Sequence, residues 1–258
     1  MGFFSKLFEK KVCAICGGEI GLLGNRKLED GNMCKACAAK LSPWFSDRRN
    51  STVAEIKEQL AYREANQDAV AAFHVTRVLG EGTKVLLDED ARKFMVTRAR
   101  NWQEENPDVM DFSQVTGCQL DIDEDRDEEK REDKDGNSVS YNPPRYRYSY
   151  DFTMIIRVNH PYFDEISFRL NSSSVETTDG TAVPAFRKPN PQFHPEYSEY
   201  ANMGTEIKEI LTQARQEARE DAKAAAAPKA AVICPNCGAT TTPDASGCCE
   251  YCGGSVNG

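Results

Sequence analysis

Cys13-Ala14-Ile15-Cys16 and Cys34-Lys35-Ala36-Cys37 are the stretches that decide the fold of the N-terminal part of this chain. A CxxC turn directs two sulfurs at one point, and two such turns supply the four thiolates that a tetrahedral Zn²⁺ accepts at about 2.3 Å each. The spacing between the two pairs is typical of four-cysteine zinc sites. Asp30-Gly31 predicts a hairpin turn before the second pair, which would begin a short helix. We therefore expect residues 12–50 to form a treble-clef-like zinc module.

A second pair of CxxC turns stands at Cys234-Pro235-Asn236-Cys237 and Cys249-Glu250-Tyr251-Cys252. It predicts a short zinc ribbon over residues 232–258, a segment too small to bury a core, so the metal would supply its folding free energy. Cys248 competes with Cys249 as a ligand, and we favour Cys249 because it keeps two residues between the ligands. Catalytic zinc usually keeps an open position, whereas both quartets are closed. We expect two structural Zn²⁺ ions, bound by Cys13, Cys16, Cys34, Cys37, Cys234, Cys237, Cys249 and Cys252.

The composition is that of a soluble globular protein, since 40% of the 258 residues are hydrophobic and 28% are charged. No apolar run approaches the roughly 20 residues that cross a bilayer, and the first residues lack the apolar core of a secretory signal. We therefore expect a cytoplasmic protein, in which thiols stay reduced and CxxC pairs bind metal instead of forming disulfides. The net charge of −9 disfavours a protein that coats nucleic acid.

Between the cysteine modules, helical spacing of apolar residues predicts a connecting helix over 51–72, with Thr52 and Glu55 as its capping box. Alternating β-branched and aromatic residues then predict a β domain over 73–221, which ends in a helix at Met203–Glu220. The strands expected in this domain are His74–Leu79, Lys84–Leu87, Lys93–Thr97, Phe112–Ile122, Tyr148–Val158 and Ile166–Leu170.

Two further segments are predicted to lack regular secondary structure. The polar stretch 123–144, which includes the acidic residues 123–135 and ends at Pro143-Pro144, predicts an exposed loop. Residues 222–231, which include a run of alanines before Pro228, predict a linker to the C-terminal ribbon. Cys118 stands in a predicted strand and is expected to be a core thiol.

Taken whole, the chain resembles an uncharacterised bacterial family of unknown function. Members open with a Phe/Lys-rich leader and a four-cysteine module, and they close with a ribbon of the CPxCG…CxYCG type. The middle section resembles a pleckstrin-homology (PH) or GRAM-type domain in the stretches Lys84–Thr97, Asp111–Ile122 and Tyr150–Leu170. The resemblance implies an α+β, multi-module protein, in which a PH-like antiparallel β barrel or sandwich with a C-terminal helix lies between the two zinc modules.

No GxSxG, HExxH or P-loop motif occurs in the sequence. We therefore expect a non-enzymatic adaptor that binds protein partners, and no small-molecule substrate is evident. Residues 1–11 form a leader in which Phe3, Phe4, Leu7 and Phe8 would share one face among lysines. Such a leader could make peripheral contact with an anionic membrane, and the alternatives are that it packs against the adjacent zinc module or simply frays.

Two other classes of function stay open at this stage. The first is a regulatory zinc-finger protein that binds nucleic acid, because basic side chains of the first module could contact phosphates. The second is an enzyme whose catalytic groups come from distant parts of the β domain. The basic side chains of the first module are Arg26, Lys27, Lys35, Lys40, Arg48 and Arg49.

Overall fold

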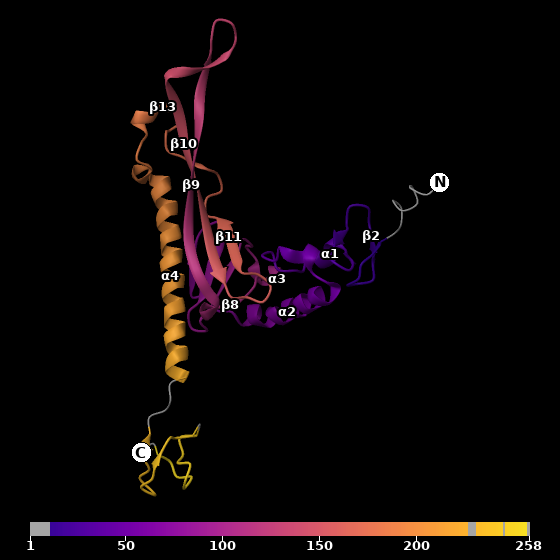
Figure 1. Ribbon diagram of the computed structural model, residues 1–258, viewed down its shortest axis with the longest axis vertical. Helices are drawn as coiled ribbons and strands as arrows, with labels where there is room; N and C mark the ends of the chain where they lie inside the picture. The colour runs from indigo at the N-terminus through magenta and orange to yellow at the C-terminus, as the bar shows by residue number, and fades with distance from the viewer. Residues whose placement is uncertain (1–10, 227–230, 245, 257–258) are drawn as a thin grey trace, which may run out of the picture. The chain divides into compact units, whose positions relative to one another are not determined.

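The computed structural model describes residues 11–226, 231–244 and 246–256. The chain divides into two compact units, Met1–Gln216 and Glu217–Gly258 (Figure 1). Residues 1–10, which make up nearly all of the amphipathic leader, lie outside the described residues. Among the described residues, no helix combines the length and the apolar character that crossing a bilayer requires.

The first unit begins with a small cysteine module. Strand β1 (Lys11–Val12) pairs with β2 (Glu19–Ile20), and β3 (Arg26–Lys27) pairs with β4 (Asn32–Met33). The helix α1 (Lys35–Ala38) and the 3-10 helix η2 (Asp47–Asn50) follow. Within the described part of the chain, the core of this module has only six buried residues, and two of them are cysteines. The buried residues of this core are Cys13, Leu28, Met33, Cys37, Leu41 and Ile56.

Helix α2 (Val53–Ala72) links this module to the β domain. Its predicted capping box is confirmed, because the Thr52 side chain accepts from the backbone N–H of Glu55 while the Glu55 carboxylate accepts from that of Thr52. One stripe of the helix is buried, and it runs from Ile56 in the core of the cysteine module to Val70 beside the first β-sheet. The buried residues of the stripe are Ile56, Gln59, Arg63, Asn66 and Val70.

The first sheet is an antiparallel meander of four strands, with the short helix α3 (Trp102–Glu105) inserted before the last of them. Strands β6 and β7 consist mostly of Val, Leu, Phe and Met and show little alternation of apolar and polar residues. Nearly all of their side chains are buried, because both faces of these strands are covered. The strands are β5 (Arg77–Leu79), β6 (Lys84–Asp88), β7 (Lys93–Thr97) and β8 (Met110–Asp111).

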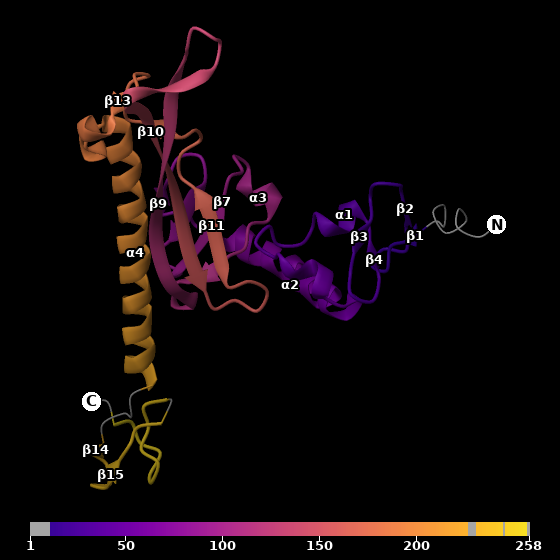
Figure 2. The same ribbon diagram turned by 45° about the horizontal axis from the view of Figure 1, so that its top comes forward.

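The second sheet is organised around a long hairpin of β9 (Val115–Glu132) and β10 (Ser138–Val158). The other edge of β10 pairs with β11 (Glu165–Arg169), β12 (Val175–Glu176) and β13 (Val183–Pro184). Figures 1 and 2 show the end of the β9–β10 pair projecting beyond the rest of the sheet. The 3-10 helices η3 (Phe112–Gln114), η4 (Ala185–Arg187) and η5 (Pro191–Phe193) connect the elements.

The prediction of a loop over residues 123–144 is wrong, although the segment is largely exposed: β9 continues to Glu132, β10 begins at Ser138, and the turn itself is confined to residues 133–137. Charged residues can form these paired strands because both faces of the ribbon are exposed to solvent and oppositely charged side chains face each other across the strands. Arg147 pairs with Asp127 at 2.8 Å, and Arg126 lies over the ring of Tyr146. At the end, the Asp133 carboxylate accepts from the backbone N–H of Asp135 and of Asn137.

Helix α4 (Pro195–Ala226) is longer than predicted at both ends. Pro195 starts it early, since proline suits the first turn of a helix, and its last turns occupy part of the predicted linker 222–231. Figures 1 and 2 both show α4 lying along β9 and β10. Gly204 allows this approach, because a Cβ there would stand 2.5 Å from a methyl group of Leu120 on β9.

No hydrogen-bonded strand pair among the described residues joins the two sheets, so the expected barrel is not closed. The turn η3 interrupts the chain between β8 and β9, which then enters the second sheet. Unit 1 is therefore a mixed α/β structure with two antiparallel sheets. The second unit holds the end of α4, a two-stranded sheet of β14 (Val232–Ile233) and β15 (Thr240–Thr241), and the second cysteine group.

Candidate metal centres

The structure brings the first four predicted cysteines together. The Sγ atoms of Cys13, Cys16, Cys34 and Cys37 all lie within 4.8 Å of one another, and those of Cys16 and Cys34 are 3.9 Å apart. Four sulfurs at about 2.3 Å from a central Zn²⁺ would be spaced by about 3.8 Å. The cluster therefore has the dimensions of a tetrahedral metal site.

Local backbone geometry explains how this first cluster forms. The N–H of Cys13 donates to the carbonyl of Gly18, and the N–H of Gly17 returns to the carbonyl of Cys13, both at 2.8 Å. Gly17 has φ of +73°, which a residue without Cβ adopts readily. The second pair comes from α1, where Cys34 is the N-cap residue and Cys37 lies in the helix. A knuckle and a helix start thus supply two ligands each.

The second four predicted cysteines are also together, with all Sγ atoms within 4.8 Å. The distance is 3.6 Å between the sulfurs of Cys234 and Cys252, and 3.7 Å between those of Cys237 and Cys249. Both values again fit the edge of a ZnS₄ tetrahedron, about 3.8 Å. The donor set and the dimensions of both clusters are those of a zinc site.

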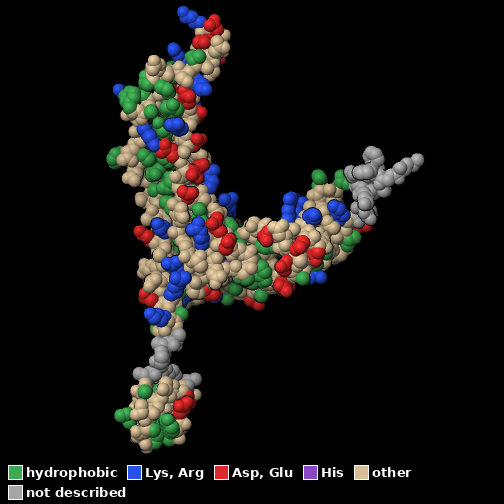
Figure 3. Space-filling view, in the orientation of Figure 1, with side chains coloured by type: hydrophobic (Ala, Val, Ile, Leu, Met, Phe, Trp, Pro, Cys, Tyr) green, Lys and Arg blue, Asp and Glu red, His purple; other side chains and the backbone are tan. Residues whose placement is uncertain are grey.

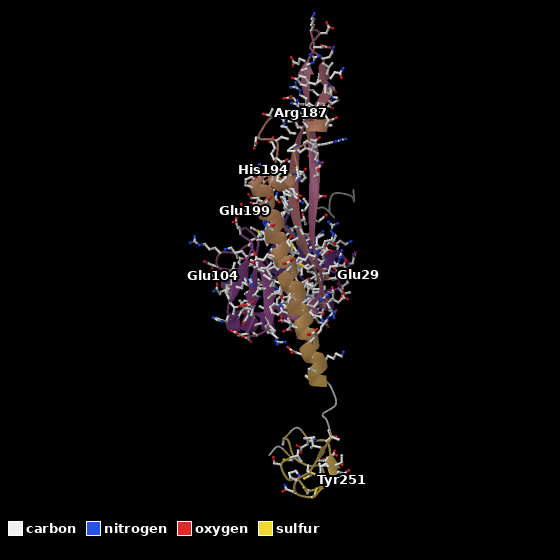
Figure 4. All side chains as sticks on the ribbon, turned by 90° about the vertical axis from the view of Figure 1, so that its left-hand side faces the viewer. Glu29, Glu104, Arg187, His194, Glu199 and Tyr251 are labelled. Atoms are coloured by element: carbon white, nitrogen blue, oxygen red, sulfur yellow. The ribbon has the colours of Figure 1, made fainter. Side chains whose placement is uncertain are left out.

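This second cluster is built from two knuckles of the same form. The N–H of Gly238 donates to the carbonyl of Cys234 at 2.9 Å, and that of Gly253 donates to Cys249 at 2.8 Å. Both glycines have positive φ, +71° and +67°. Tyr251 stands between two ligands, and its side chain is 72% exposed (Figure 4).

Two cysteines lie outside the quartets. Cys248 is excluded from the second cluster, and its thiol lies 3.9 Å from the carbonyl of Ser246. Cys118 is half-buried on β9, and burial raises the pKa of its thiol to about 12. The preference for Cys249 over Cys248 as a ligand therefore agrees with the geometry.

The thiols of the first quartet differ in how readily they ionise. Burial raises the pKa of Cys13, but hydrogen bonds from the backbone N–H groups of Cys16, Cys34 and Ile15 outweigh burial and lower this pKa to about 6. Burial, and then contact with the Cys34 thiol, raises the pKa of Cys37 to about 12. One thiol thus ionises easily while another resists, chiefly because burial disfavours its thiolate and to a smaller extent because Cys13 already carries negative charge. A divalent cation at the centre would compensate that charge and bind all four as thiolates.

The sequence did not reveal how the first cysteine module is attached to the β domain. The Arg63 guanidinium on α2 pairs with Asp108 at 2.7 Å, and their side chains are 7% and 0% exposed. Ser42 donates to the other Asp108 oxygen at 2.7 Å, and Arg63 also donates to the carbonyl of Lys40. One signal existed in the sequence, namely an arginine in phase with the apolar face of the predicted helix.

A cavity of about 610 Å³ lies at the same junction. Its wall includes Trp44 from the cysteine module, Arg63 from α2, and Thr97 and Phe168 from the two sheets. The indole N–H of Trp44 is buried without a hydrogen-bond partner among the described groups. The junction is therefore incompletely packed, in contrast to the closed cysteine clusters.

The structure brings four of the six predicted basic residues of the first module onto two elements in contact. Arg26 and Lys27 lie on β3, and Arg48 and Arg49 lie on η2, which contacts β3. Lys35 is on α1.

Comparison with known proteins gives one match. Residues 11–59 match the family described as "Domain of unknown function (DUF4428)". This range covers the first quartet and the first turns of α2, and it ends before the β domain. No curated protein and no solved structure matches the chain. The N-terminal cysteine-rich segment is thus similar to a family of unknown function, and the two clusters fit zinc modules.

Proposed function

We propose that this protein is a non-enzymatic, cytoplasmic adaptor, in which two structural zinc modules hold interaction surfaces on either side of a PH-like β domain. The observation that carries the proposal is the pair of closed quartets. Each cluster offers four sulfurs at tetrahedral spacing, and no His, Asp or Glu among the described residues adds a fifth ligand. Zinc bound in this way has no free position for water or substrate, so it organises the chain instead of reacting.

The assignment of module types rests on the order of elements. In the first module a knuckle, the hairpin β3–β4 and the ligand-bearing α1 follow one another, which is the order of a treble clef. In the β domain four antiparallel strands precede the β9–β11 strands and a long helix covers the second sheet, as the resemblance to PH-like domains implies. Two knuckles beside a two-stranded sheet support a zinc ribbon in the second unit.

Among the described residues, a candidate location for an enzymatic role is a hollow of about 760 Å³ that His160, Asp164 and Glu165 line together with Asp47. His160 is fully engaged there. Its Nε2 lies 2.8 Å from the Tyr62 hydroxyl, and its Nδ1 accepts from the backbone N–H of Tyr162. Its ring stacks on Phe163 with centroids 4.0 Å apart. With both nitrogens occupied by the protein, this histidine is better placed to join elements than to transfer protons.

The test is affinity capture by the full-length, zinc-loaded chain from a lysate of the source organism, with the retained proteins and lipids quantified. Cys16→Ser and Cys237→Ser each disable one module, and Cys118→Ser is the matched control because that thiol belongs to neither quartet. We expect a stoichiometric partner that one of the ligand variants loses and the control keeps. Recovery of no protein and no lipid by the wild type would contradict the proposal.

A second candidate is nucleic-acid binding, which the grouping of Arg26 and Lys27 with Arg48 and Arg49 favours. Phosphate contacts need such a basic surface. The net charge of −9 opposes it. A gel-shift series over salt concentration tests whether the protein binds nucleic acid. A complex that weakens steeply with salt supports this candidate, and the absence of any complex at low salt removes it.

A further inference from the structure

The connection between β2 and β3 exposes two neighbouring leucines. The N–H of Gly24 donates to the carbonyl of Gly21 at 2.9 Å, which closes a β-turn with Leu22 and Leu23 at its two central positions. Their side chains are 89% and 90% exposed. Single exposed leucines are common, but an adjacent pair at the two central positions of a turn keeps its apolar surface in water unless a partner covers it.

One cationic group lies directly beside this turn, and a second lies next to the strand that follows it. The Arg26 guanidinium donates to the carbonyls of Leu23 and Asn25, at 3.4 and 3.2 Å. Arg48 donates to the carbonyl of Lys27 at 2.6 Å. Burial, and then the like charges of Arg49 and Arg26, lower the pKa of Arg48, so these guanidinium groups share one neighbourhood. Figure 3 shows Lys/Arg and hydrophobic side chains close together on the first cysteine module.

The chain also enters the module next to the same turn. Lys11 pairs with Ile20, the residue directly before Gly21, and the neighbouring Val12 is 55% exposed. The sequence that precedes Lys11 is rich in Phe and Lys. Lys11 and Val12 therefore lie at the same end of the module as the Leu22–Leu23 turn.

We propose that the Leu22–Leu23 turn inserts into an anionic lipid surface while the four cations Arg26, Lys27, Arg48 and Arg49, its basic rim, contact the headgroups. This inference rests on the proposed adaptor function and specifies the class of its partner. A zinc ion with four thiolates adds a charge of about −2 to the module. Attraction to anionic headgroups therefore depends on the position of the basic rim beside the leucines and not on the net charge of the module. Insertion of apolar side chains together with basic residues at the headgroups is the usual combination for peripheral attachment.

Nucleic acid would use the basic rim but gain little from the leucines, because phosphates and sugars offer them no apolar surface. The two partners therefore predict different responses to removal of the leucines. A membrane requires both the turn and the rim, whereas nucleic acid requires the rim alone.

The experiment is vesicle sedimentation with the full-length, zinc-loaded protein, using phosphatidylcholine vesicles with and without about one-third phosphatidylserine. We expect binding only to the anionic vesicles. The double variant Leu22→Ser/Leu23→Ser should lower the partition coefficient about ten-fold or more, and Arg26→Gln/Arg49→Gln should lower it by roughly five-fold for each charge removed. Phe193→Ser is the matched control, since Phe193 is 84% exposed but lies on η5, outside the module.

Zinc content and far-UV circular dichroism of every variant are measured alongside. If the wild type holds two zinc ions but ignores anionic vesicles, or if the leucine variant binds them as well as the Phe193 control does, the membrane proposal is wrong while the adaptor function stands. Binding to an oligonucleotide without binding to vesicles overturns it in favour of nucleic acid. A wild type without zinc overturns both proposals.

Discussion

The guanidinium of Arg63 and the carboxylate of Asp108 form a buried ion pair with Nη1 and Oδ1 2.7 Å apart. Arg63 belongs to α2, whose first turns carry Ile56 into the core of the cysteine module. Asp108 precedes β8 in the first sheet and also accepts from Ser42 of the cysteine module. This pair therefore holds the first cysteine module and the β domain in one unit.

Removal of one partner of this pair should destabilise the protein strongly. Asp108→Asn leaves the Arg63 cation buried without its counter-charge, and we expect a loss of about 3–5 kcal/mol in the free energy of unfolding. Lys93→Gln breaks an exposed ion pair with Asp111 and should cost at most about 1 kcal/mol. Urea unfolding measures both. Equal, small losses for the two variants would show that the buried pair does not hold the junction.

His160 should make the stability of unit 1 depend on pH. Burial lowers the pKa of this ring, with a partly compensating effect of Asp108. The unfolded state then binds a proton more readily than the folded state, so stability is present above the unfolded pKa of about 6.5 and declines as pH falls below it. The slope is at most about 1.4 kcal/mol per pH unit, and less for a half-buried ring.

Urea unfolding between about pH 7.5 and 6 tests this dependence while the zinc thiolates stay bound. The comparison is between the wild type, His160→Gln and His74→Gln, because the His74 side chain is 76% exposed. We expect a shallower pH dependence in the His160 variant alone. Parallel curves for all three proteins would refute the assignment.

The cysteine modules were predictable because their geometry is local. A CxxC turn sets the relation of two sulfurs within four residues, and a glycine after the knuckle, such as Gly17 or Gly238, marks the positive φ that the turn adopts. The capping box of α2 is equally local. Only the meeting of the two CxxC pairs in each quartet depends on distant parts of the chain, and metal chemistry supplies that information.

The acidic ribbon and the junction were not predictable for the opposite reason. On the tip side of the ribbon, over residues 123–132 and 138–147, the two strands bury no side chain completely, so no apolar alternation distinguishes a strand from a loop there. The evidence for pairing is the match of Asp127 with Arg147, which are far apart in sequence. Arg63 and Asp108 likewise come from separate elements, and a charged residue on its own predicts an exposed position.

Thiol reactivity should separate the ten cysteines into classes. In the zinc-loaded protein at about pH 8, Cys248 should react first with Ellman's reagent, and Cys118 slowly because burial raises its pKa to about 12 and leaves little thiolate. The eight quartet cysteines should react only after a strong chelator removes the metal. The variants Cys118→Ser and Cys248→Ser assign the two early reactions. Immediate reaction of all cysteines without chelator would mean that neither quartet is metal-bound.

The two sites should lose metal independently. Cys16→Ser removes a ligand from the first quartet and Cys237→Ser from the second, and these quartets lie in different units. Each variant should therefore retain one zinc ion, while Cys248→Ser should retain both. Atomic absorption of the purified proteins gives the counts. Loss of zinc from Cys248→Ser but not from Cys249→Ser would reverse the ligand assignment in the second unit.

The most direct test of the account is the metal content of the intact chain, determined by native mass spectrometry on freshly purified, untagged protein. The two sulfur clusters predict two zinc ions per chain, released together with eight titratable thiols when a chelator is added. A chain that carries fewer than two zinc ions, or one whose quartets are oxidised to disulfides, would contradict it.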